Sequence, residues 1–228
     1  MRTNLACQLD SSDALPLELI NGKVVAMARP SIRHTMIAVS IFNIFDRYLK
    51  GCKCRAFPDG VDVYLTKRER YIPDVMVVCD PDKVKANGIH GAPDLVVEIL
   101  SPATAKNDRG HKKAVYERCG VREYWIVDPV ALTVEQYVLE DAPESVLESI
   151  SEGAAESTVE SAPDSSIDTR SAYHTRPAYA LRDVYTLYHG EMLEYLSDEE
   201  RAELVTEFHC SLFDDLSIRL EEIFERVI

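Results

Sequence analysis

Residues 91–102 have the sequence GAPDLVVEILSP, in which every residue from Leu95 to Leu100 is apolar except Glu98. A short apolar run between turn-forming residues is typical of a buried strand. A carboxylate inside such a run is costly to bury unless it meets a cation, a metal ion or hydrogen-bond donors. The stretch therefore predicts a buried strand with a functional or paired acid at Glu98.

A second acid stands at the beginning of another apolar run. Residues 72–78 have the sequence IPDVMVV, which places Asp74 at the start of a strand. Two carboxylates from adjacent strands can hold Mg²⁺, which takes one or two carboxylates together with water and substrate phosphate oxygens. The alternative is that Glu98 pairs with a core arginine or lysine while Asp74 caps a turn. The residues themselves favour neither interpretation.

A helix is predicted from Asn107 or Asp108 to about Cys119, with Gly120 as its end. Asp108, Lys112 and Tyr116 recur every four residues and so share one face. A lysine on that face could reach a metal site, or it could form a solvated Asp–Lys pair. Lys113 points about 100° further round the helix.

Asp94 belongs to a second Pro-Asp pair, four residues before Glu98. Four strand residues at ~3.3 Å each separate the two backbones by about 13 Å. Oxygens that bind one Mg²⁺ lie ~2.1 Å from the ion, so they must be about 3 Å apart. Asp74 can approach Glu98 across strands spaced ~4.8 Å, and we therefore expect Asp94 to lie outside the site.

The other predicted elements give a mixed α/β or α+β domain with a central sheet. Asn21-Gly22 between apolar runs predicts a hairpin over residues 17–27, and Ser31 is a candidate N-cap for a helix that ends at Lys50-Gly51. Strands are predicted over residues 52–57, 61–65, 71–79, 95–100, 123–127 and 133–139, with a polar loop over 80–91 that could hold a short helix around 83–86.

Charge divides the chain near residue 139. Residues 1–138 carry 19 Lys and Arg against 17 Asp and Glu, a net +2, and residues 139–228 carry 6 against 22, a net −16. The predicted organisation is a core over 1–139, an acidic flexible insertion or linker over 140–172, and a C-terminal segment over 173–228 that packs back on the core as a helical extension. A near-neutral core can hold a local basic patch, but its nonspecific affinity for nucleic acid should be modest and sensitive to salt.

The six cysteines, at positions 7, 52, 54, 79, 119 and 210, are scattered. They are interpreted as reduced thiols of a cytoplasmic protein. No run is long and apolar enough to span a bilayer, so no membrane association is expected.

Taken in order, several of these stretches resemble the Uma-two family of restriction-endonuclease-like proteins, which have the PD-(D/E)XK type of fold. The resemblance rests on residues 17–23, 72–78, 91–102, 120–129 and 212–217, on Ser31 with His34, and on Asp108 with Lys112 and Tyr116. It implies that Asp74 and Glu98 bind the metal and that a lysine lies near the scissile phosphate, with Glu18 as a weaker candidate for a supporting acid. The usual superfamily lysine position is Leu100 here, and Lys112 fits the place of a lysine supplied from the following helix.

The sequence therefore predicts an endonuclease, dependent on Mg²⁺ or Mn²⁺, that hydrolyses phosphodiester bonds in nucleic acid. DNA is the expected substrate, and a homodimer is plausible by analogy, since cutting both strands of a duplex usually needs two sites. The rival hypothesis is a non-catalytic binding or assembly module that keeps the nuclease fold. His34 is interpreted as a packed or capping histidine rather than a catalytic one, and Trp125 as a core residue.

Overall fold

The computed structural model describes residues 15–141 and 177–227. Its main sheet has the strand order β12-β11-β10-β9-β6-β3, in which β9 and β10 run parallel and the other neighbours run antiparallel. The strands are β3 (Arg55–Pro58), β6 (Val75–Val78), β9 (Leu95–Ile99), β10 (Glu123–Asp128), β11 (Thr133–Glu140) and β12 (Ala178–Thr186). The fold is a mixed α+β domain, as the sequence predicts.

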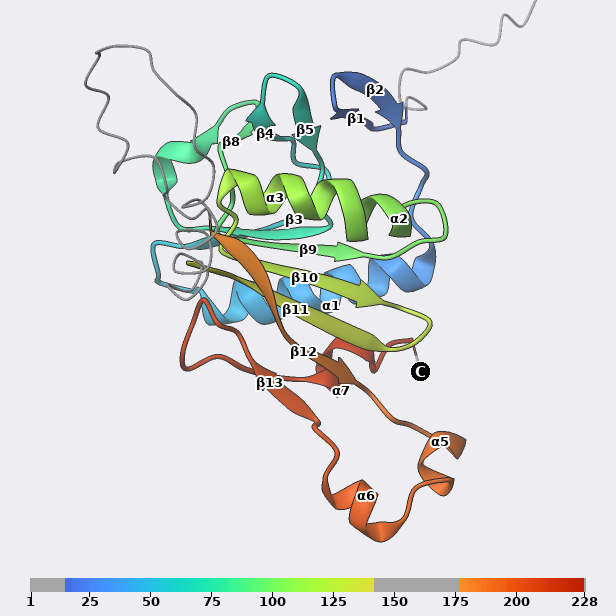
Figure 1. Cartoon of the computed structure of the whole chain (residues 1–228). Helices are drawn as coiled ribbons and strands as arrows, with labels where there is room; N and C mark the ends of the chain where they lie inside the picture. The colour runs from blue at the N-terminus through green and yellow to red at the C-terminus, as the bar shows by residue number, and fades with distance from the viewer. Residues whose placement is uncertain (1–14, 142–176, 228) are drawn as a thin grey trace, which may run out of the picture.

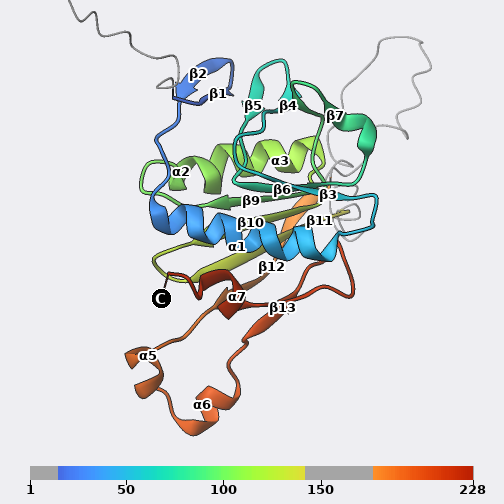
Figure 2. The same ribbon diagram turned by 180° about the vertical axis from the view of Figure 1, so that it is seen from behind.

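Helices cover both faces of this sheet (Figures 1 and 2). One face carries α1 (Ile32–Tyr48), which begins where the Ser31 hydroxyl accepts a hydrogen bond from the His34 amide. The other carries α2 (Ala105–Asn107), a π-helical turn (Asp108–Lys112) and α3 (Lys113–Cys119). Parallel strands require such a crossover connection, and this one places its helices over β9. Among the described helices, none is long and apolar enough to cross a membrane.

The strands alternate between two apolar cores. Val75, Val97 and Trp125 face α1, whereas Met76, Val96 and Tyr124 pack with Tyr116 of α3 and its neighbours. Trp125 is fully buried and contacts Phe45 and Phe208, so its interpretation as a core residue is confirmed.

A smaller sheet lies beside α3 with the order β2-β1-β5-β4-β8-β7 (Figure 1). Its strands are β1 (Leu17–Ile20), β2 (Lys23–Ala26), β4 (Val63–Thr66), β5 (Glu69–Tyr71), β7 (Val84–Lys85) and β8 (Gly88–His90). β1 and β2 form the predicted hairpin, and both turn residues, Asn21 and Gly22, have positive φ, as a tight hairpin turn requires.

Two predictions of secondary structure are wrong in this region. The single strand predicted over residues 71–79 is two strands of different sheets, because Pro73 between them cannot donate to a ladder. The loop predicted over 80–91 instead contains β7 and β8, preceded by a 3₁₀ turn (Pro81–Lys83), and the short helix expected around 83–86 is absent.

The described C-terminal residues return to the core at β12 and at α7 (Leu220–Phe224). Leu216, Leu220, Ile223 and Phe224 are buried, and α7 packs against α1. A paired segment, β13 (Glu207–His209) with β14 (Ser217–Arg219), precedes α7, so strands as well as helices make up the C-terminal segment that the sequence predicts as a helical extension.

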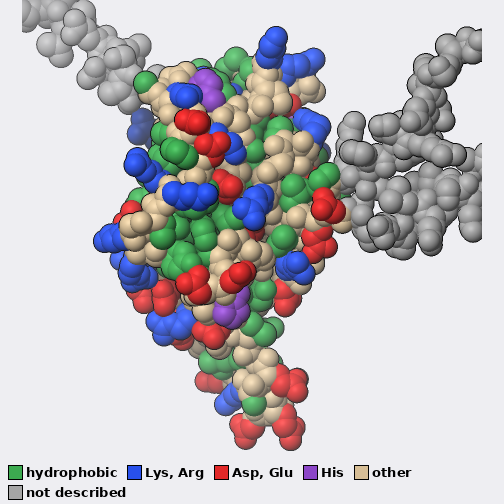
Figure 3. All heavy atoms as spheres, turned by 90° about the vertical axis from the view of Figure 1, so that its left-hand side faces the viewer, with side chains coloured by type: hydrophobic (Ala, Val, Ile, Leu, Met, Phe, Trp, Pro, Cys, Tyr) green, Lys and Arg blue, Asp and Glu red, His purple; other side chains and the backbone are tan. Residues whose placement is uncertain are grey.

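Between β12 and β13 the chain forms a projecting lobe with α5 (Glu191–Glu194) and α6 (Asp198–Ala202) (Figure 1). A space-filling view shows acidic side chains gathered on this lobe, while acidic and basic side chains alternate over the rest of that face (Figure 3). Part of the C-terminal negative charge therefore stands away from the body of the domain.

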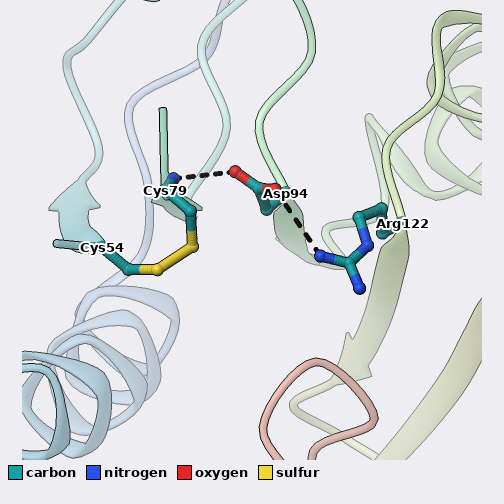
Figure 4. The surroundings of a disulfide bond; sticks show 4 residues. All are labelled: Cys54, Cys79, Asp94 and Arg122. Carbon is teal, nitrogen blue, oxygen red and sulfur yellow. Dashed lines mark hydrogen bonds and ion pairs between the residues drawn. A yellow bond between two sulfur atoms is a disulfide. The ribbon is translucent and has the colours of Figure 1, made fainter. Parts of the chain in front are cut away.

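Cys54 and Cys79 form a disulfide at the end of the β3–β6 pair, so the interpretation of all six cysteines as reduced thiols is wrong for these two. The antiparallel register pairs Arg55 with Val78, which brings the flanking cysteines together. Asp94 accepts a hydrogen bond of 2.7 Å from the Cys79 amide beside this disulfide (Figure 4). Cys52, Cys119 and Cys210 are free, and Cys7 lies outside the described residues.

Residues 142–176, which include most of the acidic insertion predicted over 140–172, lie outside the described residues. The strands on either side of it are adjacent, since Glu140 of β11 pairs with Ala178 of β12. We expect that replacing residues 144–166 with a short Gly/Ser linker leaves the melting temperature within a few degrees, because the paired strands already hold the two ends together. A large fall, measured by calorimetry, would show that the segment contributes to the core.

Candidate active site

A cavity of about 640 Å³ opens where the C-terminal end of β9, the N-terminus of α1 and the start of α2 meet. Its ionisable lining includes Asp74, Glu98, Asp108 and Lys112, together with His34 and Asp59. The three residues that the sequence analysis places at the centre of the site, Asp74, Glu98 and Lys112, therefore line one cavity.

Strand register brings the two predicted metal-binding acids together. β6 and β9 are antiparallel with Val75 opposite Val97, so Asp74, just before β6, lies across from Glu98. Asp74 Oδ2 accepts hydrogen bonds from the Ile99 amide at 2.6 Å and from His34 Nε2 at 3.1 Å. Asp74 is thus anchored to both β9 and α1.

Glu98 is almost completely buried and points toward the crossover helix. Its Oε1 accepts hydrogen bonds from Lys112 Nζ at 3.1 Å and from the Tyr116 hydroxyl at 2.8 Å. Burial raises the pKa of Glu98 well above its ordinary value, the Lys112 charge opposes that shift, and the charges of Asp108, Asp74 and Glu18 add to it. Glu98 therefore has the cation partner that its burial requires.

Lys112 lies at the centre of three carboxylates. Its Nζ is 2.8 Å from Glu18 Oε1, 3.1 Å from Glu98 Oε1 and 3.8 Å from Asp108 Oδ1, and its side chain is only 1% exposed. Burial lowers its pKa, but the charges of these acids outweigh that effect and raise it above the ordinary value. The alternative of a solvated Asp–Lys pair is wrong, because the group is buried.

Glu18 contacts Lys112 but does not line the cavity. It comes from the β1–β2 hairpin and is fully buried, and its Oε1 also accepts a hydrogen bond of 3.0 Å from the Ile72 amide. It is absent from the cavity lining, so it contacts the lysine without facing the cavity.

Two residues lie elsewhere, as the sequence analysis expects. Asp94 is beside the disulfide, with Arg122 at 3.9 Å, and lines a different pocket (Figure 4). Lys113 places its Nζ 3.5 Å from the centre of the Tyr137 ring. The neighbouring position in the helix therefore points away from the carboxylates that surround Lys112.

His34 and Asp108 are site residues to which the sequence analysis gave no role in metal binding or catalysis. The spacing with Lys112 was a signal for Asp108, whereas nothing in the sequence linked His34 to Asp74. Burial lowers the pKa of His34, but the hydrogen bond and charge of Asp74 raise it by more, so the pKa lies above its ordinary value.

The donor set suits a hard divalent cation, because carboxylate oxygens are the ligands that Mg²⁺ prefers. Asp108 Oδ1 and Glu18 Oε2 are buried without a hydrogen-bond partner, which leaves two oxygens of the carboxylate cluster around Lys112 unsatisfied. Within the described residues, no three His, Cys, Asp or Glu side chains converge closely enough to hold a metal ion. Two carboxylates with water and a substrate phosphate would suffice for Mg²⁺, so the residues present fit such an ion.

A mixed α+β core with paired acids at adjacent strands and a lysine above them is typical of restriction-endonuclease-like proteins. The chain belongs to the Uma2 family, whose model is described as "Putative restriction endonuclease" and matches residues 6–170. Membership of this family supports a nuclease function at the level of the family.

The chain is similar to two known proteins. The uncharacterized protein slr1290 of Synechocystis sp. is 31% identical over 126 residues, which are 54% of this chain and 66% of that relative. A crystal structure from Anabaena variabilis, described as "a putative nuclease belonging to DUF820", has a TM-score of 0.58 at 16% identity and covers 93% of this chain and 91% of its own. At that identity the likeness shows the fold, and it agrees with the fold class expected from the sequence.

Proposed function

We propose that the protein is an endonuclease that uses Mg²⁺ or Mn²⁺ to hydrolyse phosphodiester bonds in nucleic acid, with DNA as its substrate. The observation that carries the proposal is the placement of Asp74 and Glu98 opposite each other in one cavity, with Lys112 on Glu98. Restriction-endonuclease-like families use divalent metals, and the family of this chain supports a nucleic-acid substrate.

In this proposal, Asp74 and Glu98 hold the cation. Bound cation would supply an activated water and neutralise charge on the scissile phosphate. Lys112 lines the same cavity and steadies the negative charge that develops on the phosphate. Leu100 is buried and apolar at the usual superfamily lysine position, so the crossover helix supplies the positive charge.

Glu18 holds Lys112 from the side away from the cavity, through the contact of 2.8 Å. The ammonium is thereby fixed before substrate arrives, which reduces the reorganisation needed in the transition state. A homodimer, which would supply two sites for the two strands of a duplex, and a cytoplasmic location belong to the same proposal.

The rival function is a non-catalytic module that keeps the fold, and the acidic lobe at α5 and α6 favours it, since such a surface could dock a basic partner.

Metal binding distinguishes the proposed nuclease from the non-catalytic module. We expect millimolar Mn²⁺ to raise the melting temperature of the wild type. At a concentration 100 times the Kd, the bound ion should add about 2.7 kcal/mol to the free energy of unfolding. Asp74→Asn should lose that shift. A wild type that gains no stability from Mn²⁺ would support the module.

A further inference from the structure

His34 lines the cavity and is held there by both its backbone and its ring. It is the third residue of α1, and its amide donates to the capping Ser31 hydroxyl at 3.2 Å. Its side chain is only 12% exposed and places Nε2 3.1 Å from Asp74 Oδ2. Since a carboxylate oxygen only accepts, Nε2 carries the proton in this contact.

Asp74 depends on donors from other elements for its orientation. It stands outside β6, directly after Pro73, so no ladder of its own strand fixes it. The Ile99 amide and His34 Nε2 both donate to Oδ2, and among the described residues no hydrogen bond to Oδ1 is present. Two donors from different directions on one oxygen fix the plane of the carboxylate and leave Oδ1 for another partner.

We propose that His34 is a positioning residue that orients the Asp74 carboxylate for a divalent cation. The inference rests on the proposed function, because Asp74 is the ligand in question. His34 does not bind the ion itself in this arrangement, since its Nε2 is engaged by Asp74. Its remaining ring nitrogen, Nδ1, is buried without a hydrogen-bond partner in the described structure, so no second partner sets the ring orientation. The contact with Asp74 therefore fixes the ring as well as the carboxylate.

Removing a single hydrogen-bond partner that orients a metal ligand typically lowers metal affinity by about 10- to 100-fold. We expect His34→Leu to raise the Kd for Mn²⁺ by that factor, because leucine has a similar bulk but no hydrogen-bond donor in its side chain. His34→Gln can place an amide donor near the position of Nε2 and should bind Mn²⁺ almost as tightly as the wild type. His90→Leu is the matched control, because His90 contacts Tyr64 and Asn87 outside the cavity.

The measurement is a calorimetric titration of the metal-free, full-length protein with Mn²⁺, with circular dichroism to confirm folding. If His34→Leu does not fold, His34→Asn takes its place, because the shorter amide cannot reach Asp74. A nuclease assay across Mn²⁺ concentrations adds a second readout. A positioning role predicts that saturating Mn²⁺ restores most of kcat in His34→Leu.

Equal Mn²⁺ affinity in the wild type and His34→Leu would overturn this inference while leaving the proposed metal site intact. A kcat that stays low at saturating Mn²⁺ would also overturn it, since His34 would then act on the reaction and not on the ion. A wild type that binds no Mn²⁺ would overturn both the inference and the proposed function.

Discussion

Replacing Lys112 with alanine should lower the free energy of unfolding by about 3–5 kcal/mol, as expected when one partner of a buried ion pair is removed. The variant takes away the cation that contacts Glu18, Glu98 and Asp108, all of which are almost fully buried. Urea unfolding at neutral pH in the presence of a chelator measures the loss.

The size of this loss should depend on pH. Burial raises the folded-state pKa values of Glu98 and Asp108 above their ordinary values, and the Lys112 charge opposes the rise. Without Lys112 these pKa values rise further. A raised folded-state pKa means that the folded protein binds more protons than the unfolded one, so stability falls as pH rises through it. The deficit of the variant should therefore shrink as the pH is lowered from neutrality.

Lys113→Ala is the matched control, because Lys113 is the adjacent lysine and contacts a ring instead of carboxylates. Loss of this cation–π contact with Tyr137 should lower the free energy of unfolding by only about 0.5–1 kcal/mol. If the two alanine variants were equally stable at neutral pH, the central role of Lys112 in the carboxylate cluster would be wrong.

The second large effect concerns the two Pro-Asp aspartates. We expect Asp74→Asn to reduce metal-dependent cleavage by about 100-fold or more, comparable to losing one group that stabilises transition-state charge. Asp94→Asn should retain most activity, because Asp94 bonds to the Cys79 amide beside the disulfide, away from the cavity. The assay follows cleavage of a labelled duplex with Mn²⁺ after circular dichroism confirms folding. An inactive Asp94→Asn beside an active Asp74→Asn would reverse the assignment.

Much of the sheet could be predicted because its strands are apolar runs bounded by turn residues, as at β9 and β10. β12 could not, since Ala178–Thr186 is a largely exposed strand with no clear alternation. The two-residue β7 carries too little pattern to distinguish it from a loop. The Cys54–Cys79 disulfide depends on the pairing of β3 with β6, which the spacing of the cysteines does not reveal.

Proximity in the site could be predicted only where local geometry decides it. Asp74 and Glu98 follow from the adjacency of two strands, and Lys112 with Tyr116 from the period of a helix. The contact of Glu18 with Lys112 joins residues far apart in the chain, and that of His34 with Asp74 depends on how α1 packs. Glu18 was therefore suggested by family resemblance alone, and His34 was interpreted as a packed or capping residue. The roles of all these residues in catalysis stay predictions.

The most direct test of the central claim is cleavage of a DNA duplex by the wild type and Glu98→Gln, each with Mn²⁺ and with a chelator. Glutamine keeps an oxygen that can accept from Lys112 and Tyr116, so the variant should fold while losing the charge that holds the cation. The proposal predicts cleavage only by the wild type and only with Mn²⁺. Cleavage that persists in Glu98→Gln, or in the presence of the chelator, would contradict it.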